Sequence, residues 1–68
     1  MKNKINQLRA EHKWSQAVLA DMVGVSRQAI NAVETGKHDP SLLLAFKIAH
    51  AFNLAIEEVF DPEDQLTS

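Results

Sequence analysis

The chain has 68 residues, of which 46% are hydrophobic, and it contains no cysteine. This length allows one domain with a modest core, and the missing cysteines exclude disulfides and thiolate metal sites. A domain this small needs another source of stability, so we expect close helix packing, self-association or both. The sequence has no apolar run of membrane-spanning length and no signal-peptide core, which predicts a cytoplasmic protein.

Charge is distributed unevenly along the chain. The formal net charge is −2, but all seven Lys and Arg residues precede residue 57, and five of the nine acidic residues follow residue 56. Residues 1–56 therefore carry seven positive and four negative charges, a net of +3. We interpret the chain as a domain over 1–60 followed by a short acidic tail at 61–68. An ordinary mixed surface explains the charges equally well, so charge alone does not identify a partner.

The first half of the sequence predicts two helices. Ile5 and Leu8 lie one helical turn apart in a polar stretch, which indicates an amphipathic helix over about 2–12. A second helix begins after Ser15, because a serine hydroxyl can accept a hydrogen bond from the free amides of the first turn. This helix ends at Gly24, where a left-handed residue is suited to terminate it.

The same signals return at once and predict a third helix. Ser26 is a second serine cap, Ile30 and Val33 lie on one face, and Gly36 is a second stop signal. Two short helices joined by a three-residue turn that contains glycine are typical of a helix-turn-helix. We therefore expect the reading unit of the protein to span residues 15–36.

Two further helices complete the expected all-α fold. Asp39 and Pro40 are typical of a helix start, so they predict a fourth helix that runs to about Phe52. A short fifth helix is expected over about 56–60, weakly capped because Ala55 carries no hydroxyl. No segment alternates as a strand would.

Residues 15–36, SQAVLADMVGVSRQAINAVETG, resemble the core of the phage repressor and Cro-like family, also called the xenobiotic-response-element type. The resemblance extends over residues 3–60. It implies a compact five-helix repressor-like domain that binds DNA through its second and third helices. An unrelated small helical bundle is the alternative. The residues that carry the resemblance are Leu19, Ala20, Gly24, Val25, Ile30 and Val33.

The third helix carries the candidate base-contacting residues. With Ile30 and Val33 turned inward, Arg27, Gln28 and Asn31 remain on the outer face, and the resemblance places them at the family's base-contacting positions. Arginine can form two hydrogen bonds with guanine, and Gln or Asn can do the same with adenine. The alternative is that these residues are only the solvated face of an amphipathic helix.

Other positions are candidates for phosphate contact or for structural support. At the start of the second helix, Gln16 lies beside free backbone amides that can hold a phosphate. The residues that we expect to contact phosphates are Gln16, Ser26, Thr35 and Lys37. In the family, an arginine on the first helix often pairs with a glutamate that ends the third. The resemblance therefore predicts an ion pair between Arg9 and Glu34.

The fourth helix contains three consecutive leucines, at 42, 43 and 44, which cannot all face one core because successive positions turn by about 100°. We therefore expect a twofold homodimer interface. Packing of these side chains within one chain is the alternative. The expected interface residues are Leu43, Leu44, Ile56, Val59 and Phe60.

These observations predict a sequence-specific transcriptional regulator, a repressor that binds double-stranded DNA at a pseudo-palindromic operator as a homodimer. Alternatives within the fold are an antitoxin or a restriction-modification controller. An alternative from another class is a protein-interaction module without DNA binding. The sequence contains no catalytic constellation, and its three histidines lie in different elements, so we expect no enzyme activity, cofactor or metal.

Overall fold

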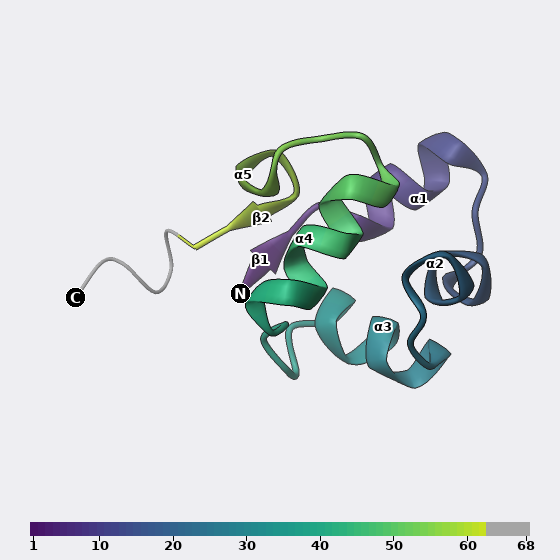
Figure 1. Cartoon of the computed structure of the whole chain (residues 1–68), viewed down its shortest axis with the longest axis horizontal. Coiled ribbons are helices and arrows are strands. Elements are labelled where there is room, and N and C mark those ends of the chain that lie inside the picture. The colour runs from purple at the N-terminus through teal and green to yellow at the C-terminus, as the bar shows by residue number, and fades with distance from the viewer. Residues whose placement is uncertain (63–68) are drawn as a thin grey trace.

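The computed structural model describes residues 1–62, and Figure 1 shows them as a helical domain with one small strand pair. The helix α2 packs against both α3 and α4, and α4 packs against α5. The expected five-helix architecture is confirmed. Of the predicted acidic tail at 61–68, residues 63–68 lie outside the described part of the chain. The elements are β1 (Lys2–Asn3), α1 (Ile5–His12), α2 (Gln16–Val23), α3 (Arg27–Glu34), α4 (Leu42–Ala51), α5 (Ile56–Val59) and β2 (Phe60–Asp61).

Serine hydroxyls start three of the helices. Ser15, Ser26 and Ser41 each accept a hydrogen bond of 3.1 Å from the backbone amide three residues later. The first two caps confirm the sequence prediction. The predicted start of the fourth helix was wrong, because Ser41 caps α4 in place of Asp39. The Asp39 carboxylate instead accepts from the Met1 ammonium group at 3.0 Å.

Left-handed residues end several helices. Gly24 has a φ of 78° directly after α2, and Gly36 has a φ of 80° shortly after α3. A Cβ atom added at either glycine would meet no atom within 4 Å, so the backbone angle alone requires glycine there. Asn53, with a φ of 57°, lies two residues after the end of α4.

The strand pair was not predicted. β1 and β2 are antiparallel, with Lys2 opposite Asp61 and Asn3 opposite Phe60. The Lys4 amide continues this contact by donating to the Val59 carbonyl at 2.8 Å. Consequently α1 begins at residue 5, not 2, and α5 ends one residue before the expected 60. Strands of two residues are too short to show an alternating pattern in the sequence.

The core gathers side chains from all five helices and from β2. The most completely enclosed are Ile5, Leu19, Ile30, Ile48 and Val59. Phe60 is only 4% exposed and Val59 only 1%, so both belong to the core of one chain and not to a surface between copies. That part of the predicted dimer interface was wrong.

The described helices include none that is long and apolar enough to cross a bilayer.

An aromatic stack closes the corner between α1 and α2. Trp14 is half-buried, and its ring lies 4.4 Å from the His12 ring and 5.3 Å from the Phe52 ring, stacked on both. Offset stacking of this kind adds to the free energy gained from apolar burial. The stack fixes the chain as it enters α2 and so holds the start of the reading unit against α4.

Candidate nucleic-acid interface

The turn between α2 and α3 is built by backbone hydrogen bonds. The amides of Gly24 and Val25 both donate to the Ala20 carbonyl, at 2.8 and 3.0 Å. Ala20 is 3% exposed, and its small side chain allows α2 and α3 to cross closely. Val25 packs against the core, and Ser26 then starts α3. Figure 1 shows α3 along one edge of the molecule with α2 beside it.

One face of α3 is buried and the other is exposed. Ile30 and Val33 are 0% and 4% exposed, whereas Arg27, Gln28 and Asn31 all lie in solvent. Within residues 1–62, no hydrogen bond or ion pair engages these three polar side chains. The structure thus places the predicted base-contacting residues together on the first two turns of one capped helix.

The residues that are predicted to contact phosphates differ in the hydrogen bonds that their side chains already make. Ser26 and Lys37 lie on the surface at the two ends of α3, and Ser26 uses its oxygen to cap the helix. Thr35 is also exposed, but its hydroxyl donates to the Asn31 carbonyl at 2.8 Å. Its single hydrogen is therefore bonded within the helix in the unbound protein, and Thr35 would have to release the Asn31 carbonyl to donate to a phosphate oxygen.

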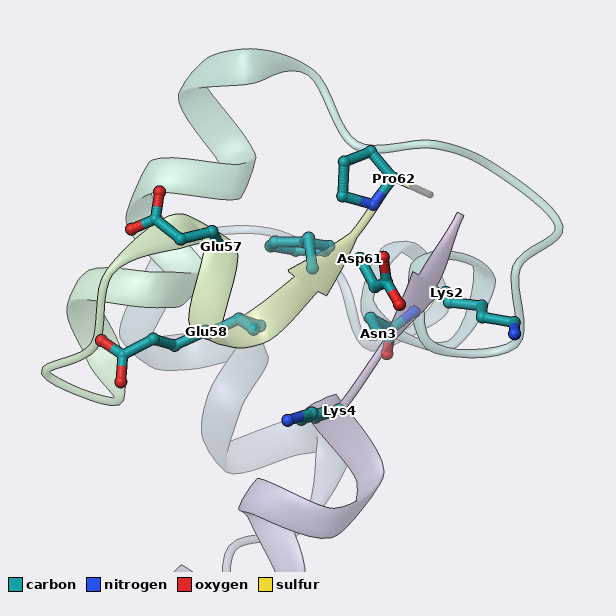
Figure 2. A pocket seen from close by; sticks show the side chains of 9 residues that line it. Lys2, Asn3, Lys4, Glu57, Glu58, Asp61 and Pro62 are labelled. Carbon is teal, nitrogen blue, oxygen red and sulfur yellow. The ribbon is translucent and has the colours of Figure 1, made fainter. Parts of the chain in front are cut away.

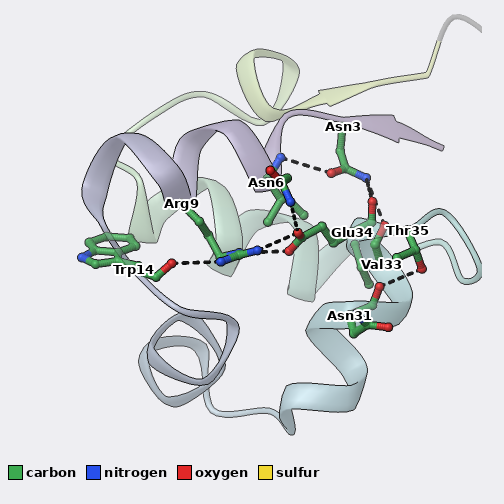
Figure 3. A network of polar contacts seen from close by, with 9 residues as sticks. Asn3, Asn6, Arg9, Trp14, Asn31, Val33, Glu34 and Thr35 are labelled. Carbon is green, nitrogen blue, oxygen red and sulfur yellow. Dashed lines mark hydrogen bonds and ion pairs between the residues drawn. The ribbon is translucent and has the colours of Figure 1, made fainter.

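Arg9 and Glu34 meet between α1 and the C-terminal end of α3 (Figure 3). Arg9 donates to the two carboxylate oxygens of Glu34, from Nη2 at 2.7 Å and from Nε at 3.0 Å. Its third nitrogen, Nη1, donates to the Trp14 carbonyl at 2.9 Å. The two side chains are 15% and 6% exposed. Arg9 therefore joins α1, the entry to α2 and the end of α3.

The local environment shifts the ionisation of both partners. Burial raises the pKa of Glu34, but hydrogen bonds from Arg9 and Asn6 and the Arg9 charge outweigh it, so the pKa lies below 4.5. Gln16 also lowers this pKa, which places its amide beside the carboxylate. The hydrogen bond to Glu34 raises the pKa of Arg9 against the opposing effect of burial. The pair is thus charged on both sides at neutral pH.

Two asparagines that the sequence does not predict also join this network. Asn6 donates to Glu34 Oε1 at 2.9 Å, and Asn3 donates to the Val33 carbonyl at 3.0 Å (Figure 3). The partner of Asn3 is a backbone group, so no complementary side chain marks the contact in the sequence.

One surface hollow adjoins the C-terminal end of α3, where Asn3, Glu34 and Thr35 line it, and the others lie elsewhere. Figure 2 shows one beside the strand pair, and the charged residues that line it are Lys2, Lys4, Glu57, Glu58 and Asp61. Its mixture of charges does not favour an ion of either sign. Two further hollows, both mainly apolar, lie between α4 and α5, and Ile56 lines both of them. None of these hollows includes an outer-face residue of α3.

Residues 5–59 match the helix-turn-helix family, over the segment that contains α1 to α5. The chain belongs to the helix-turn-helix family. Its class is that of the Cro/C1 type, as the resemblance predicted. Members of this class are DNA-binding transcriptional regulators, and this helix-turn-helix protein is one of them.

Sequence relatives match this helix-turn-helix protein over nearly its whole length. An uncharacterized HTH-type transcriptional regulator of Methanocaldococcus jannaschii is 56% identical over 64 residues, which cover 94% of this chain and 97% of that one. The uncharacterized HTH-type transcriptional regulator YgzD of Bacillus subtilis is 49% identical over 65 residues, covering 96% and 98%.

Solved structures share the arrangement of elements. The restriction-modification controller protein C.AhdI from Aeromonas hydrophila superposes with a TM-score of 0.78 at 32% identity, covering 84% of this chain and 86% of that one. A hypothetical transcription factor, NHTF from Neisseria, gives a TM-score of 0.77 at 28% identity, covering 93% and 72%. Both matches support the helix-turn-helix fold of this chain.

Proposed function

We propose that this protein is a sequence-specific repressor that binds a pseudo-palindromic operator through α3 as a homodimer. The observation that carries the proposal is the set of three exposed polar side chains, Arg27, Gln28 and Asn31, without partners in the described chain. Arg27 and Gln28 begin α3 and Asn31 follows one turn later, and the N-terminal residues of a recognition helix are the ones that meet base edges. Their chemistry suits guanine and adenine in the major groove.

Phosphate contacts would hold α3 in register. Lys37 is exposed just beyond α3 and supplies a positive charge. Gln16 lies at the first position of α2, where free backbone amides and the helix dipole favour an anion; because its side chain already bonds to Glu34, we assign the phosphate contact to the backbone there. Ser26 can offer its hydroxyl hydrogen while its oxygen caps α3. We leave Thr35 out of this set, because its hydrogen is bonded to Asn31.

The proposed dimer face differs from the one that the sequence predicts. Leu42, Leu43 and Phe46 are 70%, 65% and 54% exposed, and they lie within about one turn of α4. The hollow beside Phe46 also contains Lys47 and Glu57, so a second copy can pair opposite charges around an apolar centre. Leu44 and Ile56 pack partly against the core and border this face.

A homodimer would place two copies of α3 about one DNA turn, roughly 34 Å, apart on the two halves of an operator. Sedimentation tests the proposed face directly. Wild-type protein should dimerise at high micromolar concentration, and Leu43→Glu should sediment as a monomer. Met22→Glu is the matched control, because Met22 is 50% exposed on α2 and should leave the dimer intact. A wild-type protein that remains monomeric contradicts the dimer.

Selection of bound duplexes from a random DNA pool tests DNA reading. It should return one sequence with two related half-sites, and binding should weaken steeply as salt increases, because phosphate contacts release counterions. A protein-interaction module without DNA binding would enrich no sequence and show no salt-dependent affinity.

A restriction-modification controller is the second candidate, favoured by the structural match to C.AhdI at 32% identity. Such a protein would bind DNA beside restriction and modification genes. An antitoxin would in addition bind a protein partner. Mapping the chromosomal sites that the selected sequence occupies separates these roles, because a controller's sites lie only upstream of that gene pair.

A further inference from the structure

The Asn3 side chain links three separate backbone segments (Figure 3). Its Nδ2 donates to the Val33 carbonyl at 3.0 Å, with longer contacts to the carbonyls of Met1 at 3.3 Å and Glu34 at 3.5 Å. Its Oδ1 accepts from the Ile5 amide at 3.1 Å. One amide group therefore contacts the end of α3, the start of α1 and the residue that precedes β1.

Asn3 binds backbone groups at two helix ends. The first amides of α1 have no intrahelical partners, whereas the Val33 carbonyl near the end of α3 also accepts from the Gly36 amide at 3.1 Å, so Asn3 adds a second donor there. Lys4, which precedes α1, provides no side-chain cap. Asn3 supplies the missing acceptor at α1 and a donor at α3, and so couples these two helix ends.

Asn3 is itself firmly held. It pairs with Phe60 across the strand pair, and the adjacent Lys4 amide donates to Val59 at 2.8 Å. Val59 and Phe60 are core residues. The position of Asn3 relative to the body of the protein is thus set from the α5–β2 side, independently of the Arg9–Glu34 pair.

We propose that Asn3 is a positioning residue for DNA reading, which fixes the angle of α3 against the body and so the reach of Arg27, Gln28 and Asn31. This inference rests on the proposed function. An eight-residue helix is about 12 Å long, so a small rotation about its C-terminal end displaces the N-terminal half the most. Hydrogen bonds to base edges tolerate only small displacements, whereas flexible lysines follow a phosphate easily.

The test compares two substitutions with a charge-matched control. Asn3→Asp keeps the acceptor for the Ile5 amide but replaces the donor to α3 with an oxygen, and Asn3→Ala removes both groups. Lys4→Gln makes the same change in net charge as Asn3→Asp at an adjacent exposed residue. Each protein is titrated with the duplex selected by the wild type and with a random duplex, well below its melting temperature.

We expect Asn3→Asp and Asn3→Ala to lower the ratio of selected to random affinity about fivefold or more, as loss of one good base contact does. Their affinity for random DNA should stay within about twofold of Lys4→Gln. Equal losses on both duplexes, or an unchanged ratio, would overturn the positioning role. Destabilisation alone is recognised by a lower melting temperature with the ratio preserved.

Amide hydrogen exchange provides a readout that needs no DNA. In Asn3→Asp the amides of α3 should exchange about tenfold faster relative to those of α4 than in the wild type. Unchanged relative exchange refutes the link between Asn3 and α3, whatever the DNA result. A wild-type protein that selects no duplex refutes the proposed function instead, so the two failures are distinguishable.

Discussion

Arg9 and Glu34 form a two-point contact, with hydrogen bonds of 2.7 and 3.0 Å that join α1 to the last residue of α3. Parallel contacts of this kind are stronger and more directional than single ones. Because both side chains are largely removed from water, each charge depends on the other. The helix α3 is thus held at its C-terminal end and exposed to solvent along its outer face.

Removal of one partner should destabilise the protein strongly. Arg9→Met leaves a buried carboxylate without its counter-charge, and Glu34→Gln leaves a buried guanidinium. We expect each variant to lose about 3 kcal/mol of unfolding free energy, measured by urea denaturation. The double variant should lose clearly less than the sum, because the second substitution removes the stranded charge. Unchanged midpoints in both single variants would show that the pair contributes nothing.

Acid should weaken the same contact. The folded-state pKa of Glu34 lies below its ordinary 4.5, so the carboxylate stabilises the fold fully above that pH. This stabilisation is lost as the pH falls through the folded-state pKa. The difference in unfolding free energy between wild type and Glu34→Gln should therefore be constant near neutral pH and shrink below about pH 4.5. A difference that grows on acidification would reverse the expected sign.

The N-terminus of α5 has no side-chain cap, so a capping residue there should stabilise the protein. Ala55 has φ and ψ of −73° and 155°, close to the −73° and 157° of the capping residue Ser26. Its backbone amide already donates to the Glu58 carboxylate at 2.9 Å, so only the hydrogen bond from the capping side chain to the Glu58 amide is missing from a capping box. Ala55→Ser should raise the free energy of unfolding by about 1 kcal/mol.

A second alanine-to-serine change provides the control for this cap. Ala10 is exposed within α1, where a serine hydroxyl has no free amide to satisfy. Ala10→Ser should lower the free energy of unfolding by about 0.5 kcal/mol through helix propensity alone. If both serine variants change stability in the same direction, the cap explanation fails.

The fold could be predicted where local chemistry determines it. The caps at Ser15 and Ser26 and the stop at Gly24 each require only a few neighbouring residues, and the sequence predicts all three. The exposed face of α3 follows by elimination once Ile30 and Val33 are assigned to the core. Exposure is therefore predictable there, and contact with bases remains a prediction.

Features that depend on distant segments could not be predicted. The antiparallel pairing of Asn3 with Phe60 joins residues far apart in the chain, and its strands are too short for any pattern. Asp39 is a good helix cap by type, but the Met1 ammonium group engages it and Ser41 takes its place. The predicted dimer interface includes Val59, although this residue is buried. The sequence of a helix as short as α5 does not indicate which of its sides packs against the core.

The turn after α1 contains a strained residue. Lys13 has a φ of 59° and a ψ of 36°, a conformation that costs residues with a Cβ atom about 1 to 2 kcal/mol. Lys13→Gly should therefore stabilise the protein by up to about 1 kcal/mol, after the entropy of glycine is deducted. Lys13→Ala separates the loss of charge from the relief of strain and should bring no gain. Thermal unfolding of the two variants, measured side by side, checks the difference.

Base reading and phosphate binding should be separable by substitution. Arg27→Ala removes a side chain suited to guanine, and we expect it to reduce affinity for the selected duplex by about 1 to 3 kcal/mol while random DNA binds nearly as before. Lys37→Ala should weaken both duplexes alike and reduce the slope of log affinity against log salt by about 1. Fluorescence anisotropy over a salt series measures both effects. If Arg27→Ala instead weakens all duplexes equally with a flatter slope, Arg27 binds phosphate, and the base contacts belong to Gln28 and Asn31.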